Sequence, residues 1–224
     1  MTVAAELRTD EQIQRDVLSE LKWEASLQPN EIGVAVKDGV VTLTGWVDNY
    51  MKRWAAEEAA HRVRGVRAVA NEIEVRLPGS SVRTDADLAA EVSRALERNI
   101  LVPHEKIDVT VSDGWVRLDG EVRWQFERTE AERAVRRIPG VRCVTNAIAV
   151  RPKVHPSPTE MKRKIEEALI RNAEIDAERI NVDVQGDTVI LTGTVRSWAE
   201  REAAARAAWS APGVVAVHNQ IVVQ

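Results

Sequence analysis

One pattern of residues occurs three times along this chain of 224 residues, at nearly constant spacing. Glycines in the similar contexts VVTLTGWV, WVRLDGEV and TVILTGTV lie 75 and then 73 positions apart: Gly45, Gly120 and Gly193. The same two offsets relate three further glycines and three asparagines: Gly65, Gly140 and Gly213, then Asn71, Asn146 and Asn219. A repeat that aligns without a gap over about 68 residues predicts one small domain present in three copies.

Short segments rich in proline, glycine and serine separate the copies, at residues 77–83 and 152–156. Length alone permits one large domain or two to three small ones, so the repeat decides between these possibilities. We therefore predict three domains, which occupy residues 1–76, 84–151 and 157–224.

Each copy has the pattern of a helix, two strands, a second helix and a last strand. The first helix begins after a residue that favours the N-cap position, followed by apolar residues at helical spacing. The expected N-caps are Thr9, Thr84 and Ser157. Because Gln12 and Glu160 follow three positions later, we expect capping boxes in copies one and three.

The middle of each copy is predicted to be a β-hairpin. In the first copy residues 32–36 alternate between apolar and small residues, and Asp38-Gly39 suits a tight two-residue turn. Gly45 in the returning strand suggests a bulge or a close backbone approach, which we expect to come from a helix packed over it. An alanine-rich second helix then ends near Gly65, which suits a left-handed conformation.

The last strand follows a helical crossover, so we expect it to run parallel to the strand before that helix. The predicted fold class is therefore α+β, with three tandem αββαβ domains. Each domain is expected to form a small three-stranded mixed sheet with two helices on one face.

The positions that recur among the copies form a pattern: Asp-Gly-x-Val-x-Leu-x-Gly-x-Val, an alanine-rich helix, and then Gly-Val-x-x-Val-x-Asn-x-Ile-x-Val. This pattern resembles the BON domain. The matching residues of the first copy are Gly39, Val41, Leu43, Gly45, Val47, Gly65, Val66, Val69, Asn71, Ile73 and Val75. Copy three departs from the pattern by reversing the turn to Gly186-Asp187. The resemblance implies non-catalytic modules, several of which are linked to phospholipid binding or osmotic-stress protection at the bacterial envelope.

No group of residues has the spacing of a catalytic or metal site. The four histidines are not at metal-ligand spacing from one another, and Cys143 has no cysteine or histidine partner nearby. No phosphate loop, nucleophile elbow or zinc-protease motif is present. We therefore expect no metal, no cofactor and no enzymatic activity. The recurring asparagines either contact a ligand or satisfy a local backbone group at the start of a strand.

The distribution of charge argues against a nucleic-acid partner. The 31 lysines and arginines are mixed with 35 aspartates and glutamates, giving a formal net charge of −4. The beginning MTVAAELRTD lacks the features of an export signal, and no apolar run is long enough to span a bilayer. The chain as it stands is expected to be cytoplasmic, and periplasmic if an export signal preceded this sequence.

Tryptophan is the prominent aromatic residue, with seven present against one tyrosine and one phenylalanine. A core position should be apolar in all copies, but four tryptophans align with polar residues. Trp23 aligns with Arg98 and Arg171, Trp46 with Glu121 and Thr194, Trp54 with Thr129 and Glu202, and Trp209 with His61 and Arg136. Two others, Trp124 and Trp198, lie near the start of the second helix and are expected to cap the core.

Large apolar side chains at outward positions imply contact with something else. Trp23, Trp46, Trp54 and Trp209 are therefore the candidate interface. Four partners remain open: a neighbouring domain, a second copy of the chain in a homo-oligomer, a phospholipid or membrane surface, and a small-molecule or peptide ligand. The sequence thus favours a non-enzymatic binding or scaffolding protein connected with stress, and the alternative is a phospholipid-binding protein of the envelope.

Overall fold

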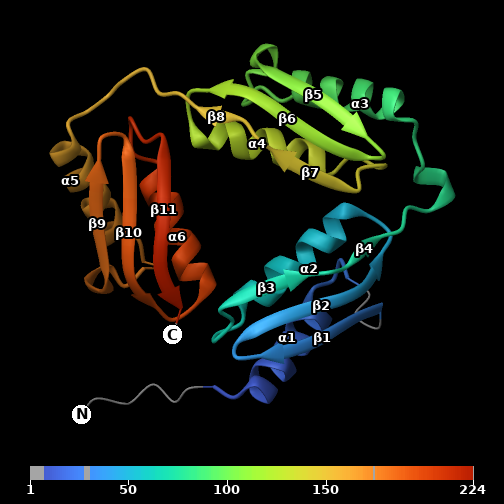
Figure 1. The fold of residues 1–224 in the computed structure, drawn as a ribbon, viewed down its shortest axis with the longest axis horizontal. Helices are drawn as coiled ribbons and strands as arrows, with labels where there is room; N and C mark the ends of the chain where they lie inside the picture. Colours follow the sequence, from blue (N-terminus) through green and yellow to red (C-terminus); the bar gives the residue numbers. More distant parts are fainter. Residues whose placement is uncertain (1–7, 28–30, 174, 224) are drawn as a thin grey trace.

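The computed structural model describes residues 8–27, 31–173 and 175–223, and it contains three units with the same order of elements (Figure 1). Residues 1–7 of the first predicted domain, where an export signal was sought, lie outside the described residues. Unit 1 contains α1 (Asp10–Trp23), β1 (Ile32–Lys37), β2 (Val40–Val47), α2 (Tyr50–Arg62), β3 (Ala68–Asn71) and β4 (Glu74–Val75). Unit 2 contains α3 (Asp85–Arg98), β5 (Ile107–Ser112), β6 (Trp115–Val122), α4 (Gln125–Arg136), β7 (Cys143–Asn146) and β8 (Ala149–Val150). Unit 3 contains α5 (Pro158–Arg171), β9 (Ile180–Gln185), β10 (Thr188–Val195), α6 (Trp198–Trp209) and β11 (Ala216–Val223).

The sheet of each unit has the predicted mixed topology. The central strand pairs antiparallel with the first strand of the hairpin and parallel with the last strand. In unit 1, for example, Leu43 of β2 lies between Val34 of β1 and Asn71 of β3. The α+β fold class with three αββαβ units is therefore confirmed.

The last strand differs among the units. In units 1 and 2 it is interrupted for two residues after Asn71 and Asn146, and it then resumes in the same register. In unit 3 the strand β11 continues without a break from Ala216 to Val223. The interruptions lie opposite Gly45 and Gly120 of the central strand.

Gly45 is required by a close backbone contact, although not with a helix. Its φ is +115°, and an added Cβ would overlap the carbonyl oxygen of Glu31, just before β1. Gly120 and Gly193 have φ of +133° and +130° and face the equivalent carbonyl oxygens of Lys106 and Arg179. The expected close backbone approach is therefore confirmed, but the expectation that a helix makes it was wrong, because the chain at the start of the neighbouring strand makes it.

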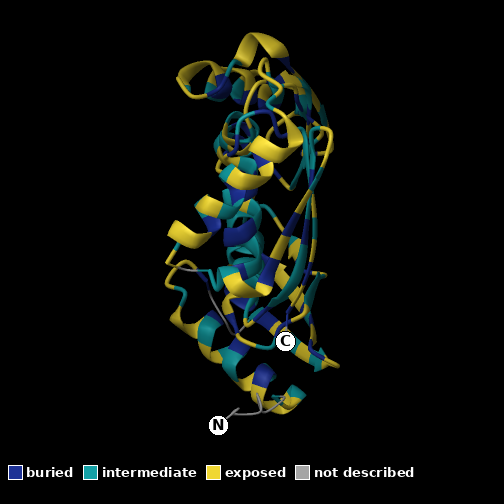
Figure 2. Cartoon of the chain, turned by 90° about the vertical axis from the view of Figure 1, so that its left-hand side faces the viewer, coloured by how far each residue is buried: buried dark blue, intermediate teal, exposed yellow. Residues whose placement is uncertain are grey.

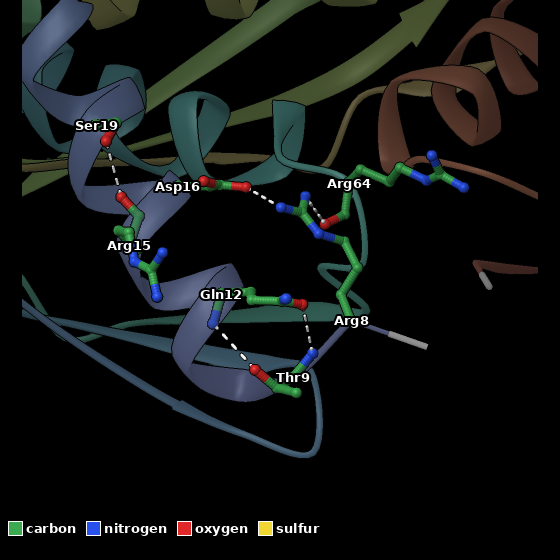
Figure 3. Close-up of polar contacts among 7 residues, drawn as sticks. All are labelled: Arg8, Thr9, Gln12, Arg15, Asp16, Ser19 and Arg64. Carbon is green, nitrogen blue, oxygen red and sulfur yellow. Dashed lines mark hydrogen bonds and ion pairs between the residues drawn. The ribbon is translucent and has the colours of Figure 1, made fainter. Parts of the chain in front are cut away.

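The first helices begin at the expected N-caps. Thr9 Oγ1 accepts a hydrogen bond from the Gln12 backbone N–H, and Gln12 Oε1 accepts one from the Thr9 N–H (Figure 3). Ser157 accepts from the Glu160 N–H, but the Glu160 carboxylate pairs with Lys164 at 2.7 Å. At α5 only the first of the two capping-box bonds is present, so the capping box predicted for copy three is not complete, in contrast to that at α1.

The three units are arranged around a common centre, with the second helix of each, α2, α4 and α6, turned toward the others (Figure 1). Seen from the side, helices lie mainly along one side of the molecule and strands along the other (Figure 2). Each unit has its own core of buried aliphatic side chains, such as Val17 and Leu43 in unit 1. The second helices therefore bring three independently packed units to one place.

Candidate functional site

A central cavity of about 1370 Å³ lies between the second helices and receives side chains from all three units. Its aromatic lining consists of Trp54, Trp124, Phe126, Trp198 and Trp209. Its charged lining consists of Arg62, Arg64, Arg133, Arg136, Arg196, Arg206, Glu58, Glu130, Glu200 and Glu202. This volume is larger than the roughly 300–1,000 Å³ typical of small-molecule pockets.

The repeat explains which side chains face the cavity. Three equivalent positions of each second helix contribute to the lining, and each position holds different residues in the three units. The equivalent sets are Trp54, Thr129 and Glu202; Glu58, Arg133 and Arg206; and His61, Arg136 and Trp209. Because these positions are separated by four and three residues, they lie on one face of each helix. The three units therefore share one fold, but each contributes different aromatic or charged side chains to the cavity.

A stacked contact joins units 1 and 3. The imidazole of His61 in α2 stacks on the indole of Trp198 in α6, with ring centroids 4.3 Å apart. The guanidinium of Arg201 lies 4.4 Å from the centroid of the same indole. Both groups therefore lie against the Trp198 indole, one from each of units 1 and 3.

Unit 2 contacts both of its neighbours. The Arg136 guanidinium lies 4.4 Å from the centroid of Trp54 in unit 1, and Tyr50 of unit 1 packs against the core of unit 2. Trp209 of unit 3 packs against the cores of units 2 and 3. Every pair of units is therefore joined by at least one aromatic side chain.

The cavity perturbs the titration of several lining groups. Burial raises the pKa of Glu58 above its ordinary value, and the negative charges of Glu202 and Glu57 raise it further. Burial also lowers the pKa of His61, which favours the neutral imidazole in the stack. Burial would raise the pKa of Glu200, but hydrogen bonds from the backbone N–H groups of Arg196 and Asp176 lower it overall.

Three buried polar atoms have no hydrogen-bond partner within the described part of the chain: His61 Nδ1, Gln125 Oε1 and Arg136 Nε. All three belong to residues that line the cavity. An unsatisfied buried group costs about 1–3 kcal/mol, and such groups are few in native proteins. The unpaired polar atoms of the described residues thus belong to the side chains around this cavity, although the atoms themselves are covered from solvent.

The four candidate interface residues lie in different environments. Trp54 and Trp209 line the central cavity. Trp23, at the end of α1, is 84% exposed, and Trp46, on β2, is 37% exposed with Arg76 5.7 Å from its ring centroid. Contact of these two with another chain stays a prediction.

Two further tryptophans belong to the site and were assigned only to the core by the sequence. Trp198 does pack against the core of unit 3, but it also carries the contact with His61. Trp124 is 39% exposed and lines the cavity. Comparison of the copies could have indicated that Trp124 faces outward, because it aligns with the polar residues Asn49 and Ser197.

The recurring asparagines connect the second helix to the last strand. Asn71 Nδ2 donates to the Arg53 carbonyl oxygen at 3.2 Å, and Arg53 Nη2 donates to the Asn71 carbonyl oxygen at 3.1 Å. Asn146 with Arg128 and Asn219 with Arg201 exchange the same two bonds. These arginines are also separated by 75 and 73 positions, so the repeat in the sequence could have indicated that they pair with the asparagines. These exchanges fix the second helices whose outer faces form the cavity.

The second group of recurring glycines follows the second helices. Gly65, Gly140 and Gly213 have φ of +89°, +105° and +91°, and each lies three or four residues beyond the last residue of its helix. The left-handed conformation lets the chain turn from the helix into the last strand. At the turn in unit 1, Arg8 bonds both Asp16 and the carbonyl oxygen of Arg64, whose guanidinium points away from this cluster (Figure 3).

Within residues 8–27, 31–173 and 175–223, no three histidine, cysteine, aspartate or glutamate side chains are placed to hold a metal ion. None of the described helices has the length and apolar character needed to cross a membrane.

Comparison with known proteins finds a matching domain family and similar individual proteins. The BON domain matches residues 9–76, 84–152 and 159–224. Osmotically-inducible protein Y of Escherichia coli strain K12 is 30% identical over 125 residues, a match that covers 54% of this chain and 62% of that protein. Among solved structures, CdsD, a structural protein of the type III secretion system of Chlamydia trachomatis, is similar over 94% of this chain and 91% of that chain, with 12% identity and a TM-score of 0.27.

Proposed function

The chain belongs to the BON domain family, and we propose that it is a non-enzymatic binding protein whose three BON domains share one composite site. The observation that carries this proposal is the central cavity, which is lined by aromatic and arginine side chains from all three units. A binding site that depends on three units also gives a physical role to the contacts between them. Similarity to an osmotically-inducible protein supports a role in the response to osmotic stress.

The non-equivalence of the units supports one shared site rather than three separate ones. Equivalent positions carry Trp54, Thr129 and Glu202, so no single unit supplies the full set of aromatic and charged groups. Sites built at the interface of domains are common places for ligands.

A fluorescent aromatic anion, anilinonaphthalene sulfonate, tests whether the cavity binds. The full chain is expected to bind the dye at one saturable site, and Trp124→Ala and Phe126→Ala are expected to weaken that binding severalfold. Ile100→Ala is the matched control, because Ile100 is fully exposed and lies outside the cavity. Equal effects of the cavity and control variants would contradict the composite site.

The connection with stress has its own test. The amount of the protein is expected to rise when the cells that make it are transferred to high osmolarity. An unchanged amount would remove the support that similarity to the osmotically-inducible relative gives.

A second candidate function is binding to a phospholipid surface, and one recurrent feature favours it. Each unit exposes a large apolar side chain within two residues of the end of its first helix: Trp23, Ile100 and Ile170. A basic residue lies in the last turn of each of these helices: Lys22, Arg98 and Arg171. Apolar residues beside basic ones are typical of peripheral contact with anionic lipid.

Co-sedimentation with vesicles of anionic phospholipid separates this candidate from the first. Under the phospholipid hypothesis, Ile100→Ala and Trp23→Arg lower binding to the vesicles, whereas Phe126→Ala leaves it unchanged. Absence of co-sedimentation at low salt would exclude this candidate, because electrostatic attraction to anionic lipid is strongest there.

A further inference from the structure

We infer that the central cavity takes an acidic peptide segment of about 11 residues that carries apolar side chains and belongs to a protein partner. This inference rests on the composite binding site proposed above and names the class of its ligand.

The charge of the lining is complementary to an acidic ligand. Six arginines and four glutamates line the cavity, an excess of two positive charges in a chain whose formal net charge is −4. Four of these arginines are paired: Arg133 and Arg196 with glutamates of the lining, and Arg62 and Arg136 with glutamates outside it. The guanidinium of Arg64 donates no hydrogen bond and forms no ion pair among the described residues. A polynucleotide carries a negative charge on every nucleotide, so its phosphates would also approach the lining glutamates, whereas a peptide can place apolar side chains beside them.

Apolar surface is available beside these charges. Trp124 and Phe126, at the start of α4, are 39% and 51% exposed, and neither ring makes an aromatic or cation–π contact within the described residues. The rings of Trp54 and Trp198 are instead covered by groups of the protein. A ligand with apolar side chains would cover Trp124 and Phe126 and remove them from water.

The unsatisfied atoms distinguish a peptide from a lipid. Arg136 Nε is a donor, Gln125 Oε1 is an acceptor, and His61 Nδ1 can take either role. A peptide main chain offers both N–H and C=O groups, and small side-chain adjustments would bring these atoms within reach of it. An acyl chain offers neither group, and a phosphate offers mainly acceptors.

The volume sets the length of the segment. A helix of about 10 Å diameter with a rise of 1.5 Å per residue occupies on the order of 120 Å³ per residue. A cavity of about 1370 Å³ therefore accommodates about 11 residues, or roughly three helical turns. Docking of an apolar helix face in a groove is a common mode of peptide recognition.

Titration of tryptophan fluorescence in the full chain tests this inference with two synthetic peptides. One contains 11 residues of glutamate and leucine, with leucines at helical spacing, and the other replaces every glutamate by lysine. The acidic peptide is expected to bind saturably and at least tenfold more tightly than the basic one. Arg64→Glu and Phe126→Ala should each weaken its binding at least fivefold, whereas the controls Arg98→Glu and Val154→Ala, outside the cavity, should not change it.

The inference would be overturned if the acidic peptide did not bind or if both peptides bound with equal affinity. It would also be overturned if Arg64→Glu and Phe126→Ala left the binding of the acidic peptide unchanged. If the chain bound vesicles of phosphatidylglycerol and this binding required Arg64 and Phe126, the cavity would be a lipid site, and the peptide inference would be overturned. If the dye binds in the cavity but the acidic peptide does not, the ligand class fails and the composite site stands. If neither binds, both proposals fail.

Discussion

The imidazole of His61 and the indole of Trp198 stack with an angle of 18° between their planes, although 136 residues separate them in the chain. Linkers join unit 1 to unit 2 and unit 2 to unit 3, but no linker joins units 1 and 3. The stacked pair therefore joins the two units that the chain itself leaves unconnected. It acts together with the contacts of Trp54 and Trp209 to hold the three second helices around the cavity.

Breaking this pair is expected to separate units 1 and 3. His61→Ala and Trp198→Ala should each increase the radius of gyration measured by small-angle X-ray scattering, because an aromatic contact worth about 0.5–1.5 kcal/mol is lost. His61→Ala is the cleaner variant, since Trp198 also packs against the core of unit 3. Trp23→Ala is the control, and equal scattering from all the proteins would contradict a role for the stack.

The same pair predicts a pH dependence. Burial holds the pKa of His61 below its ordinary value of 6.5, with Arg201 acting in the same direction and Glu57 opposing it. The closed form therefore binds fewer protons than the open form, and its stability is fully present above about pH 6.5 and is lost as the pH falls through the lowered pKa. Scattering between pH 7.5 and 5 should show expansion on acidification. A His61→Gln variant should lose this dependence, and expansion toward high pH would contradict it.

Glu58 is expected to oppose folding at neutral pH. Burial, followed by the charges of Glu202 and Glu57, raises its pKa above 4.5, so the folded state favours the protonated carboxyl. Its contribution to stability is present at low pH and is lost as the pH rises through the raised pKa. Glu58→Gln should therefore raise the melting temperature by about 2 °C at pH 7 and have little effect near pH 4. Glu97→Gln, on the exposed face of α3, is the control for loss of a charge.

The glycines of the central strands are expected to resist substitution. In Gly45→Ala the new Cβ would overlap the Glu31 carbonyl oxygen at a positive φ, and we expect a loss of more than about 3 kcal/mol in the stability of unit 1. Gly186→Ala also has a positive φ, but nothing lies within 4 Å of its added Cβ, so a loss of about 1–2 kcal/mol is expected. Denaturant unfolding followed by circular dichroism compares them, and similar losses would show that conformation alone, without the overlap, controls both positions.

The sequence predicted the units better than the site because the two depend on different interactions. Helix caps, hairpin turns and alternating strands are local patterns, and they led to the correct order of elements and sheet topology. Comparison of the copies shows that a position faces outward from its unit, but not which way the unit faces. Trp54 and Trp209 lie on second helices and line the cavity, whereas Trp23 and Trp46 lie on a first helix and a strand and do not. Orientation between units depends on contacts such as His61 with Trp198, for which no local pattern exists.

Trp23 and Trp46 lead to a prediction about self-association. Equivalent positions hold arginine, glutamate or threonine, so the fold does not need tryptophan there, and each ring can remove about 150–250 Å² from water in a contact. If a second copy of the chain covers them, light scattering after size exclusion should show a mass that increases with concentration. Trp23→Arg and Trp46→Thr, which introduce residues of the sister units, should shift the protein to the monomer without changing its melting temperature by more than about 2 °C. A wild-type chain that stays monomeric at all concentrations, with both rings open to a soluble fluorescence quencher, would exclude a homo-oligomer through this surface.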